Sequence, residues 1–212
     1  MSKGYFVTFE GIDGCGKSTQ ATLLADALEQ RGLTVSRTRE PGGTPISEKI
    51  REILIDPRNK AMVDECELLL YIAARAQHVR EKIVPLVESG AIVICDRFQD
   101  ATFAYQGYGR GISIDFLKKI NAYATGIEPD CTFVFDLPVD RAFGRMTAMN
   151  KSHDRIESAG RDFFEKIRVG YLTLAQQYPD RIVVLDGILP KEQLAEMVVH
   201  HIDSLIQSAK SL

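Results

Sequence analysis

No segment of this sequence is apolar for long enough to cross a membrane. The longest uninterrupted apolar run covers residues 91–95, whereas a transmembrane helix needs about 20 residues. Near the N-terminus, residues 4–9 are too few and too polar for the apolar region of a signal peptide, which takes about 7–15 residues. We therefore expect a cytoplasmic protein that does not associate with membranes.

The sequence also lacks a strong excess of charge and any close pair of cysteines. With 26 Lys and Arg against 29 Asp and Glu, its net charge is −3. This balance argues against nucleic acid as a partner, because such binding depends on a strong positive field. It still permits a local basic cluster that binds a small anion. Cys15, Cys66, Cys95 and Cys131 lie far apart and show no metal-ligand spacing, so we interpret them as reduced thiols.

The alternation of short apolar runs with longer amphipathic segments predicts an α/β fold. We expect one domain over residues 1–212, since domains hold roughly 150 residues. Five strands are predicted at residues 5–9, 33–36, 91–95, 131–135 and 181–185, and helices at 17–30, 46–55, 63–87, 113–124, 163–177 and from 190 onward. Such alternation builds a parallel sheet covered by helices on both faces, with ligands at the carboxyl ends of its strands.

Residues 11–18 match the phosphate-binding pattern G-x-x-x-x-G-K-[ST], between a predicted strand and a predicted helix. The glycines let backbone N–H groups point at phosphate oxygens, and the following helix adds the positive end of its dipole. Lys17 supplies charge to the β- and γ-phosphates, and the Ser18 hydroxyl is a ligand for Mg²⁺. The alternative is a glycine-rich turn with an exposed lysine. ATP contacts are expected from Gly11, Ile12, Asp13, Gly14, Cys15, Gly16, Lys17, Ser18 and Thr19.

Asp96 and Arg97, at the end of the third predicted strand, favour one reaction class among proteins with this loop. A GTPase would carry N-K-x-D after a later strand, which is missing, and a motor ATPase would end this strand in two acids. Asp96 suits the water shell of a metal ion, and Arg97 suits the phosphate of a second substrate. A structural ion pair between the two is the alternative. A nucleotide-dependent switch protein remains a competing class, which predicts slow hydrolysis without any effect of an acceptor.

Six segments in order resemble the thymidylate kinase family over essentially the whole chain: residues 9–14, 39–44, 73–75, 96–97, 104–107 and 154–157. The resemblance implies a P-loop NTPase fold with a small lid, and transfer of the ATP γ-phosphate to dTMP to give dTDP. It also implies Mg²⁺ bound by Ser18 and Asp96, and a homodimer for which the apolar side of residues 63–87 is one candidate interface. Another nucleotide or deoxynucleoside kinase is the nearest alternative.

Tyr71 and Arg75 are four residues apart in a predicted helix and therefore share one of its faces. A flat ring stacks on a base, and an arginine donates to a carbonyl such as O4 of thymine. A core position is the alternative for Tyr71. By resemblance, Thr102 and Gln106 meet the N3 edge of the base and Tyr105 crowds the ribose 2′ position. The dTMP contacts implied by the family are Asp13, Glu40, Arg51, Tyr71, Arg75, Arg97, Thr102, Tyr105, Gln106 and Glu157. Arg39 is a further helper, with an exposed or ion-paired role as the alternative for both Arg39 and Glu40.

Residues 144–160 are rich in charge and fit a lid over ATP, or else a solvated loop. The loop at residues 11–18 has no arginine, so the resemblance implies the family layout in which the lid carries the transition-state cation. Which of Arg145, Lys151 and Arg155 has that role is open. No strong base is required, because the acceptor is already an oxyanion and catalysis is positioning with charge neutralisation. The expected catalytic residues are Lys17, Arg97, Asp13, Arg145, Lys151 and Arg155.

Overall fold

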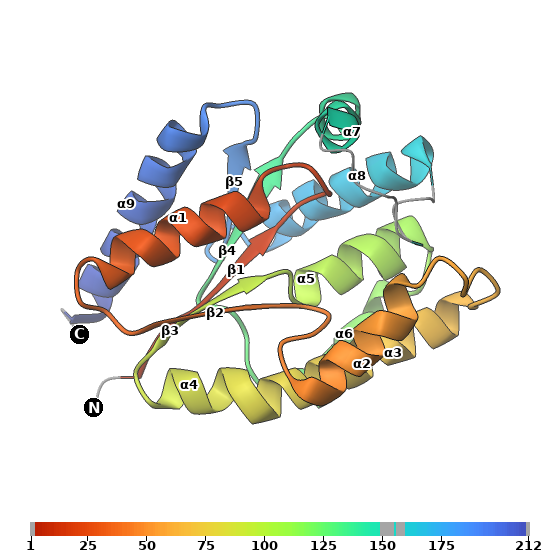
Figure 1. Ribbon diagram of the computed structural model, residues 1–212, viewed down its shortest axis with the longest axis horizontal. Helices are drawn as coiled ribbons and strands as arrows, with labels where there is room; N and C mark the ends of the chain where they lie inside the picture. Colours follow the sequence, from red (N-terminus) through yellow and green to blue (C-terminus); the bar gives the residue numbers. More distant parts are fainter. Residues whose placement is uncertain (1–2, 149–154, 156–159, 211–212) are drawn as a thin grey trace.

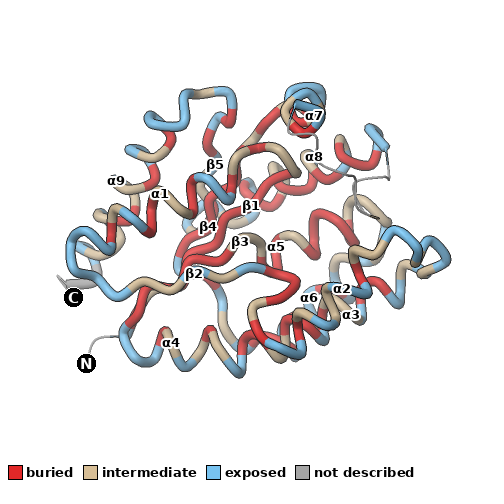
Figure 2. The backbone as a smooth tube through the Cα atoms, in the orientation of Figure 1, coloured by how far each residue is buried: buried red, intermediate tan, exposed pale blue. Residues whose placement is uncertain are grey.

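A computed structural model describes residues 3–148, 155 and 160–210, and its centre is a five-stranded sheet (Figure 1). The strands are β1 (Phe6–Glu10), β2 (Val35–Arg39), β3 (Ile92–Asp96), β4 (Cys131–Asp136) and β5 (Ile182–Asp186), in the order β2-β3-β1-β4-β5. Every neighbouring pair is parallel. The predicted parallel sheet is confirmed. β1, β3 and β4 are buried almost throughout (Figure 2), as their continuous apolar runs indicate.

Helices cover both faces of the sheet. On one face α1 (Lys17–Glu29) packs on β1, β2 and β3, and α9 (Lys191–Lys210) packs on α1. On the other face α4 (Val84–Glu88) contacts β3 and α8 (Arg161–Gln177) contacts β4 and β5. The remaining helices are α2 (Pro45–Ile55), α3 (Asp64–His78), α5 (Gln99–Thr102), α6 (Ile114–Thr125) and α7 (Val139–Ala148). In Figure 1, α2, α3 and α6 lie together on one side of the molecule.

Two predicted elements differ from the structure. The second strand, predicted at residues 33–36, runs over Val35–Arg39 in the structure. It is a half-buried edge strand with several polar residues, so its sequence does not form the continuous apolar run that identifies a buried strand. The helix expected over residues 63–87 is not uniform: a π-helical segment η1 (Val79–Ile83) separates α3 from α4. Pro85 lies two residues after this segment, in the first turn of α4, and a residue without an N–H cannot continue the regular hydrogen bonding of an α-helix.

A second π-helical segment, η2 (Phe103–Gly109), continues α5 and contacts α8 extensively. It carries the predicted base-site residues Tyr105 and Gln106. Wide turns of this kind are frequent at functional sites because they turn side chains out of the regular helical register. No helix in the described part of the chain is long and apolar enough to span a bilayer. All four cysteines are free thiols, as predicted.

Candidate active site

The loop between β1 and α1 forms the floor of the first of two adjoining cavities. Gly16 has φ 105°, and a side chain at this position would meet no atom within 4 Å, so the space in front of its backbone is open. Lys17 donates from Nζ to the Ile12 carbonyl at 3.0 Å, which folds its ammonium over the loop. The side chains of Ile12 and Cys15 are buried in the core, which leaves their backbone groups for a phosphate. Burial raises the pKa of the Cys15 thiol.

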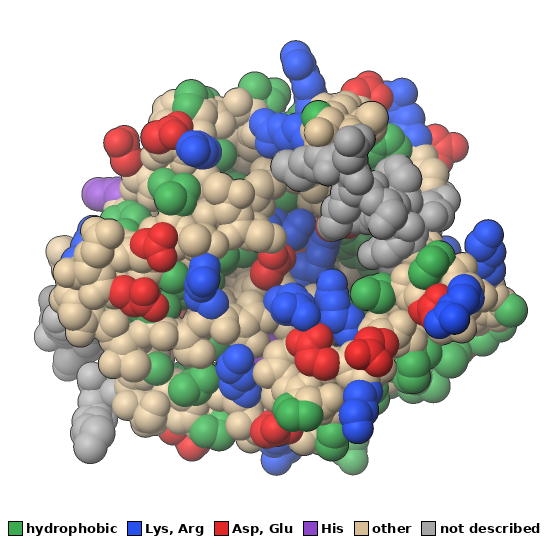
Figure 3. Space-filling view, in the orientation of Figure 1, with side chains coloured by type: hydrophobic (Ala, Val, Ile, Leu, Met, Phe, Trp, Pro, Cys, Tyr) green, Lys and Arg blue, Asp and Glu red, His purple; other side chains and the backbone are tan. Residues whose placement is uncertain are grey.

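The cavity over this loop measures about 400 Å³. Figure 3 shows a hollow at the centre of this face where Lys and Arg side chains gather. A concentration of positive charge suits polyphosphate, which the overall charge of the protein does not reveal. The lining residues are Asp13, Gly14, Gly16, Lys17, Ser18, Thr19, Arg39, Glu40, Arg51, Asp96, Arg97 and Met146.

Ser18 and Asp96 meet at the edge of this cavity, as the sequence predicts for a metal site. Ser18 lies in the first turn of α1, Asp96 ends β3, and the Ser18 hydroxyl donates to Asp96 Oδ2. Hydroxyl and carboxylate oxygens are the donors that Mg²⁺ prefers, and this ion commonly takes few protein ligands beside phosphates and water. Among the described residues there is no cluster of three or more acidic, His or Cys side chains for a metal. The site therefore fits Mg²⁺ carried by a nucleotide better than a metal held by protein alone.

Arg97 adopts φ 70°, a left-handed conformation that costs a non-glycine residue of order 1–3 kcal/mol. The Arg97 N–H donates to the Phe9 carbonyl at 2.9 Å, and the next N–H, of Phe98, donates to Glu10 Oε1 at 2.7 Å. This turn sends the guanidinium to Asp13 Oδ1 at 2.7 Å. The ion pair of Arg97 is therefore with Asp13 in the phosphate loop, and its neighbour Asp96 accepts from Ser18 instead.

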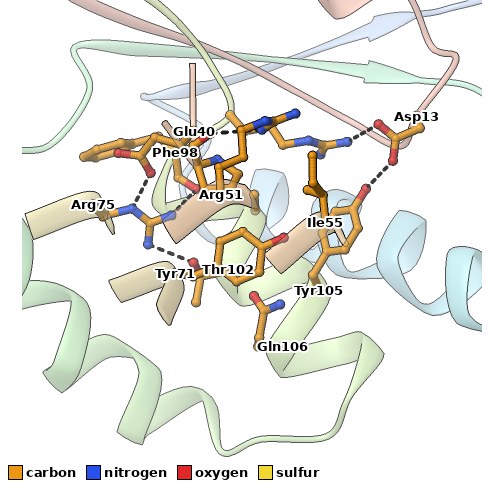
Figure 4. A pocket seen from close by; sticks show the side chains of 13 residues that line it. Asp13, Glu40, Arg51, Ile55, Tyr71, Arg75, Phe98, Thr102, Tyr105 and Gln106 are labelled. Atoms are coloured by element: carbon orange, nitrogen blue, oxygen red, sulfur yellow. Dashed lines mark hydrogen bonds and ion pairs between the residues drawn. The ribbon is translucent and has the colours of Figure 1, made fainter. Parts of the chain in front are cut away.

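The second cavity, of about 110 Å³, adjoins the first (Figure 4). Tyr71 and Arg75 both line it, as their spacing predicts. Asp13, Glu40, Arg51 and Arg97 line both cavities, so the junction between the two holds two cations and two acids. The other residues of this wall are Pro41, Ile55, Phe98, Ala101, Thr102, Tyr105 and Gln106.

Arg75 is 2% exposed and almost saturated with hydrogen bonds. Its Nε donates to Glu40 Oε2 at 2.6 Å, and Nη1 donates to Thr102 Oγ1 at 2.8 Å and to Asn121 Oδ1 at 2.6 Å. Nη2 donates to the Phe98 carbonyl at 2.9 Å. These contacts within the described residues use four of the five N–H groups of a guanidinium and leave one, on Nη2, for a further acceptor. Arg75 is thus a rigid donor with a single open position.

Glu40 and Arg39 were both predicted to help bind the acceptor, but they differ in burial and in their ion-pair partners. Glu40 is buried and accepts from both Arg75 and His78, with His78 Nδ1 3.0 Å from Glu40 Oε1. Arg39 instead pairs with Glu48 at 2.8 Å on the surface. The carboxylate of Glu40 therefore orients Arg75 from behind, while its own backbone turns through the cis bond to Pro41.

The remaining predicted acceptor residues surround the same cavity. Tyr105 donates from its hydroxyl to Asp13 Oδ2 at 3.3 Å, and the Arg97 guanidinium carbon lies 4.9 Å from the centre of the Tyr105 ring. Arg51 donates to the Pro41 carbonyl at 2.9 Å. Gln106 donates from Nε2 to Glu67 Oε1 at 2.9 Å. In Figure 4 the amide of Gln106 points towards the ring of Tyr71.

The predicted lid cations that the structure describes lie in different parts of the site. Arg145, on α7, donates to the Gly187 carbonyl at 3.0 Å and to that of Gly14 at 3.5 Å, beside the phosphate loop. Arg155 donates to Glu67 Oε2 at 2.6 Å and to the Leu54 carbonyl at 2.9 Å, and Glu67 in turn accepts from Gln106 in the cavity wall. Lys151 and Glu157 lie outside the described residues.

Sequence reasoning missed several buried polar residues around the site, and Glu10 is the most important. It ends β1, is 0% exposed, and accepts from Phe98 N–H and from the Tyr171 hydroxyl at 2.8 Å. Burial, followed by the charge of Asp100, raises the pKa of Glu10 to about 7, against the lowering effect of Arg97. An acid at the end of an otherwise apolar strand was the available signal.

A parallel sheet with a glycine-rich phosphate-binding loop, a Ser18–Asp96 pair at its edge and an adjoining second cavity is the architecture of a P-loop nucleotide kinase. The comparisons with known proteins narrow this class. Residues 9–198 match the family model for thymidylate kinase. The chain belongs to the thymidylate kinase family.

Two curated relatives illustrate how far the similarity extends. The thymidylate kinase of Citrifermentans bemidjiense is 47% identical over 211 residues, which cover 97% of this chain and 94% of the relative. That of Pelotomaculum thermopropionicum is 46% identical over 93% of this chain and 90% of its own. Among solved structures, thymidylate kinase from Ehrlichia chaffeensis matches with a TM-score of 0.78 at 33% identity, over 95% of this chain and 99% of that chain. The predicted P-loop NTPase fold and family are confirmed.

Proposed function

We propose that this chain, as one kinase domain over residues 1–212, transfers the γ-phosphate of ATP to dTMP to give dTDP and ADP. The observation that carries the proposal is the junction of the two cavities. The cavity over the phosphate loop and the cavity beside Arg75 share Asp13, Glu40, Arg51 and Arg97. Two nucleotides in these cavities meet with their phosphates at this junction, where cations offset their repulsion.

The reaction is an in-line attack by an oxygen of the dTMP phosphate on the γ-phosphorus of ATP. The bond from γ-phosphorus to the bridging oxygen breaks, and ADP leaves with that electron pair. Lys17 and the backbone N–H groups of the loop hold the donor phosphates, and Arg97 and Arg51 hold the acceptor phosphate. Ser18 and Asp96 would hold Mg²⁺, which would supply positive charge to the β- and γ-phosphates.

The donors that the structure leaves open support a base site beside Arg75. The remaining N–H of Arg75 suits a carbonyl acceptor, which O4 of thymine provides and the amino group of cytosine does not. Tyr71 stacks on the base and Thr102 adds a hydroxyl at its edge. Tyr105 crowds the ribose 2′ position, and Asp13 reaches the 3′-hydroxyl.

The cation that neutralises the transition state comes from the lid of residues 144–160, from Arg145, Lys151 or Arg155. Glu157 assists at the acceptor. Such a cation contributes about 10³–10⁵ in rate in other phosphoryl transfer enzymes. Separate alanine substitutions of the three, compared in kcat at saturating substrates, identify it by the largest loss.

We also propose a cytoplasmic homodimer that associates through the exposed sides of α3 and α6. Large apolar side chains are exposed there, with Leu69 at 55%, Phe116 at 50% and Tyr123 at 89%. The two helices that carry these residues pack on each other. Light scattering after chromatography tests this arrangement: wild type is expected at twice the chain mass of 23.6 kDa, and Leu69→Glu at the chain mass.

A coupled assay of ADP release tests the activity across dTMP, dUMP, dCMP, dGMP and thymidine. Turnover is expected to be fastest with dTMP. Turnover of thymidine but not of dTMP contradicts the proposal, since it makes the protein a nucleoside kinase. Slow ATP hydrolysis that no acceptor changes favours a nucleotide-dependent switch protein.

A further inference from the structure

Glu67 is a buried carboxylate at the base end of the acceptor cavity. It lies on α3, four residues before Tyr71, and is 0% exposed. Its Oε1 accepts from Gln106 Nε2 at 2.9 Å. Its Oε2 accepts from Arg155 at 2.6 Å and from Arg110 at 3.2 Å. Two arginines and an amide therefore converge on one side chain that has no direct place in the cavity wall.

Both oxygens of Glu67 accept hydrogen bonds, Oε1 from the amide and Oε2 from the two guanidinium groups. A carboxylate that faces these donors acts only as an acceptor. The amide of Gln106 consequently has one favourable orientation, with its NH₂ group towards Glu67 and Oε1 on the other side. Gln106 lines the cavity and is 2% exposed, so Oε1 is the part of the amide available to a base.

An acceptor at this edge distinguishes pyrimidines by their N3 atom. Thymine and uracil carry a hydrogen at N3 and donate it to such an acceptor. N3 of cytosine carries only a lone pair, which would face the lone pair of Gln106 Oε1 without a hydrogen between them. We propose that Glu67 is a positioning residue for base specificity: it holds the Gln106 amide so that only a base with an N3–H is accepted. This inference rests on the proposed function and adds a residue that acts through Gln106.

Glu67→Gln tests the inference with almost no change of shape. A glutamine at position 67 both donates and accepts, so the Gln106 amide is free to turn over and present its NH₂ group to the base. We expect the ratio of kcat/KM for dTMP over dCMP to fall about tenfold, the usual effect of one hydrogen bond. The change is expected mainly in KM for dTMP, because the phosphate-binding residues are untouched.

Arg110→Met is the matched control. It breaks the ion pair of Arg110 with Glu67 as Glu67→Gln does, but it leaves a carboxylate to orient Gln106. We expect its ratio of kcat/KM for dTMP over dCMP to stay within about twofold of wild type, even where its melting temperature falls. The Glu67 carboxylate is retained and can only accept a hydrogen bond from Gln106. An equal fall of the ratio in both variants shows that the ion pair supports the packing of the site, and overturns the inference.

A second variant covers the case in which Glu67→Gln does not fold. Gln106→Met removes the amide itself, and we expect it to lose the same selectivity. A wild-type ratio in Gln106→Met, or in folded Glu67→Gln, overturns the inference. Failure of the wild-type protein to phosphorylate dTMP at all is a different result, since it contradicts the proposed function before selectivity is measured.

Discussion

Glu10→Gln is expected to change how the stability of this protein depends on pH. Glu10 lies beneath the Arg97 turn, fully buried, with its pKa raised from 4.5 to about 7. Between these values the folded protein retains a proton that the unfolded chain releases. The free energy of unfolding therefore falls as pH rises, because the folded state binds more protons than the unfolded one.

The size of this effect follows from the two pKa values. At 1.36 kcal/mol for each pH unit, the interval from 4.5 to about 7 corresponds to about 3 kcal/mol. This contribution is fully present below pH 4.5 and is lost by the time the pH has risen through 7. Glutamine does not titrate, so the Glu10→Gln variant lacks this pH-dependent contribution to stability. The stability of wild type minus that of Glu10→Gln is expected to decrease by about 3 kcal/mol between about pH 4.5 and 8.

Urea unfolding of both proteins at half-unit steps of pH measures this difference, in which the titrating groups that do not interact with Glu10 cancel. The protein has no tryptophan, so tyrosine fluorescence and circular dichroism serve as the two probes. Coincident transitions are required as the control for two-state unfolding. A stability difference that is constant across this pH range refutes the reasoning, since it means that Glu10 titrates alike in the folded and unfolded states.

Three further predictions concern the binding sites. Lys17→Ala is expected to abolish phosphoryl transfer while dTMP still binds in calorimetry, and retained turnover counts against its role. Arg75→Ala leaves Glu40 buried without its ion pair, so we expect a loss of about 3–5 kcal/mol in urea unfolding. It also weakens selection of thymine, and an unchanged preference among dTMP, dUMP and dCMP removes Arg75 from the base site. Chelation by EDTA is expected to stop turnover and Mg²⁺ to restore it, whereas activity in EDTA contradicts a metal site at Ser18 and Asp96.

The parallel sheet and the phosphate loop were predictable because each depends on local sequence. Apolar runs identify buried strands, and the spacing of three glycines, Lys17 and Ser18 identifies the loop. The edge strand β2 and the π-helical η2 were harder. Their backbone is set by neighbours, β3 for the strand and α8 for the wide turn, that the local pattern does not contain.

The polar network around the site was less predictable for the same physical reason. The spacing of Tyr71 and Arg75 placed both on one helix face, but nothing local showed that Arg75 has a single open N–H. In the sequence, Glu10 appears only as the last residue of a strand. Glu67 appears only as an acid in the first turn of a helix. Their burial depends on Tyr171 and Arg155, which are 161 and 88 residues away along the chain.

Asp13 links the two nucleotide sites through charge. Its Oδ1 lies 2.7 Å from Arg97 and 3.8 Å from the Lys17 ammonium, so one carboxylate balances Lys17 over the phosphate loop and Arg97 at the junction of the two cavities. A phosphate that draws either cation towards itself changes the field at the other. In the proposed function, donor and acceptor affinities are therefore coupled, and thermodynamic reciprocity requires ATP to alter the dissociation constant of dTMP by the same factor as dTMP alters that of ATP.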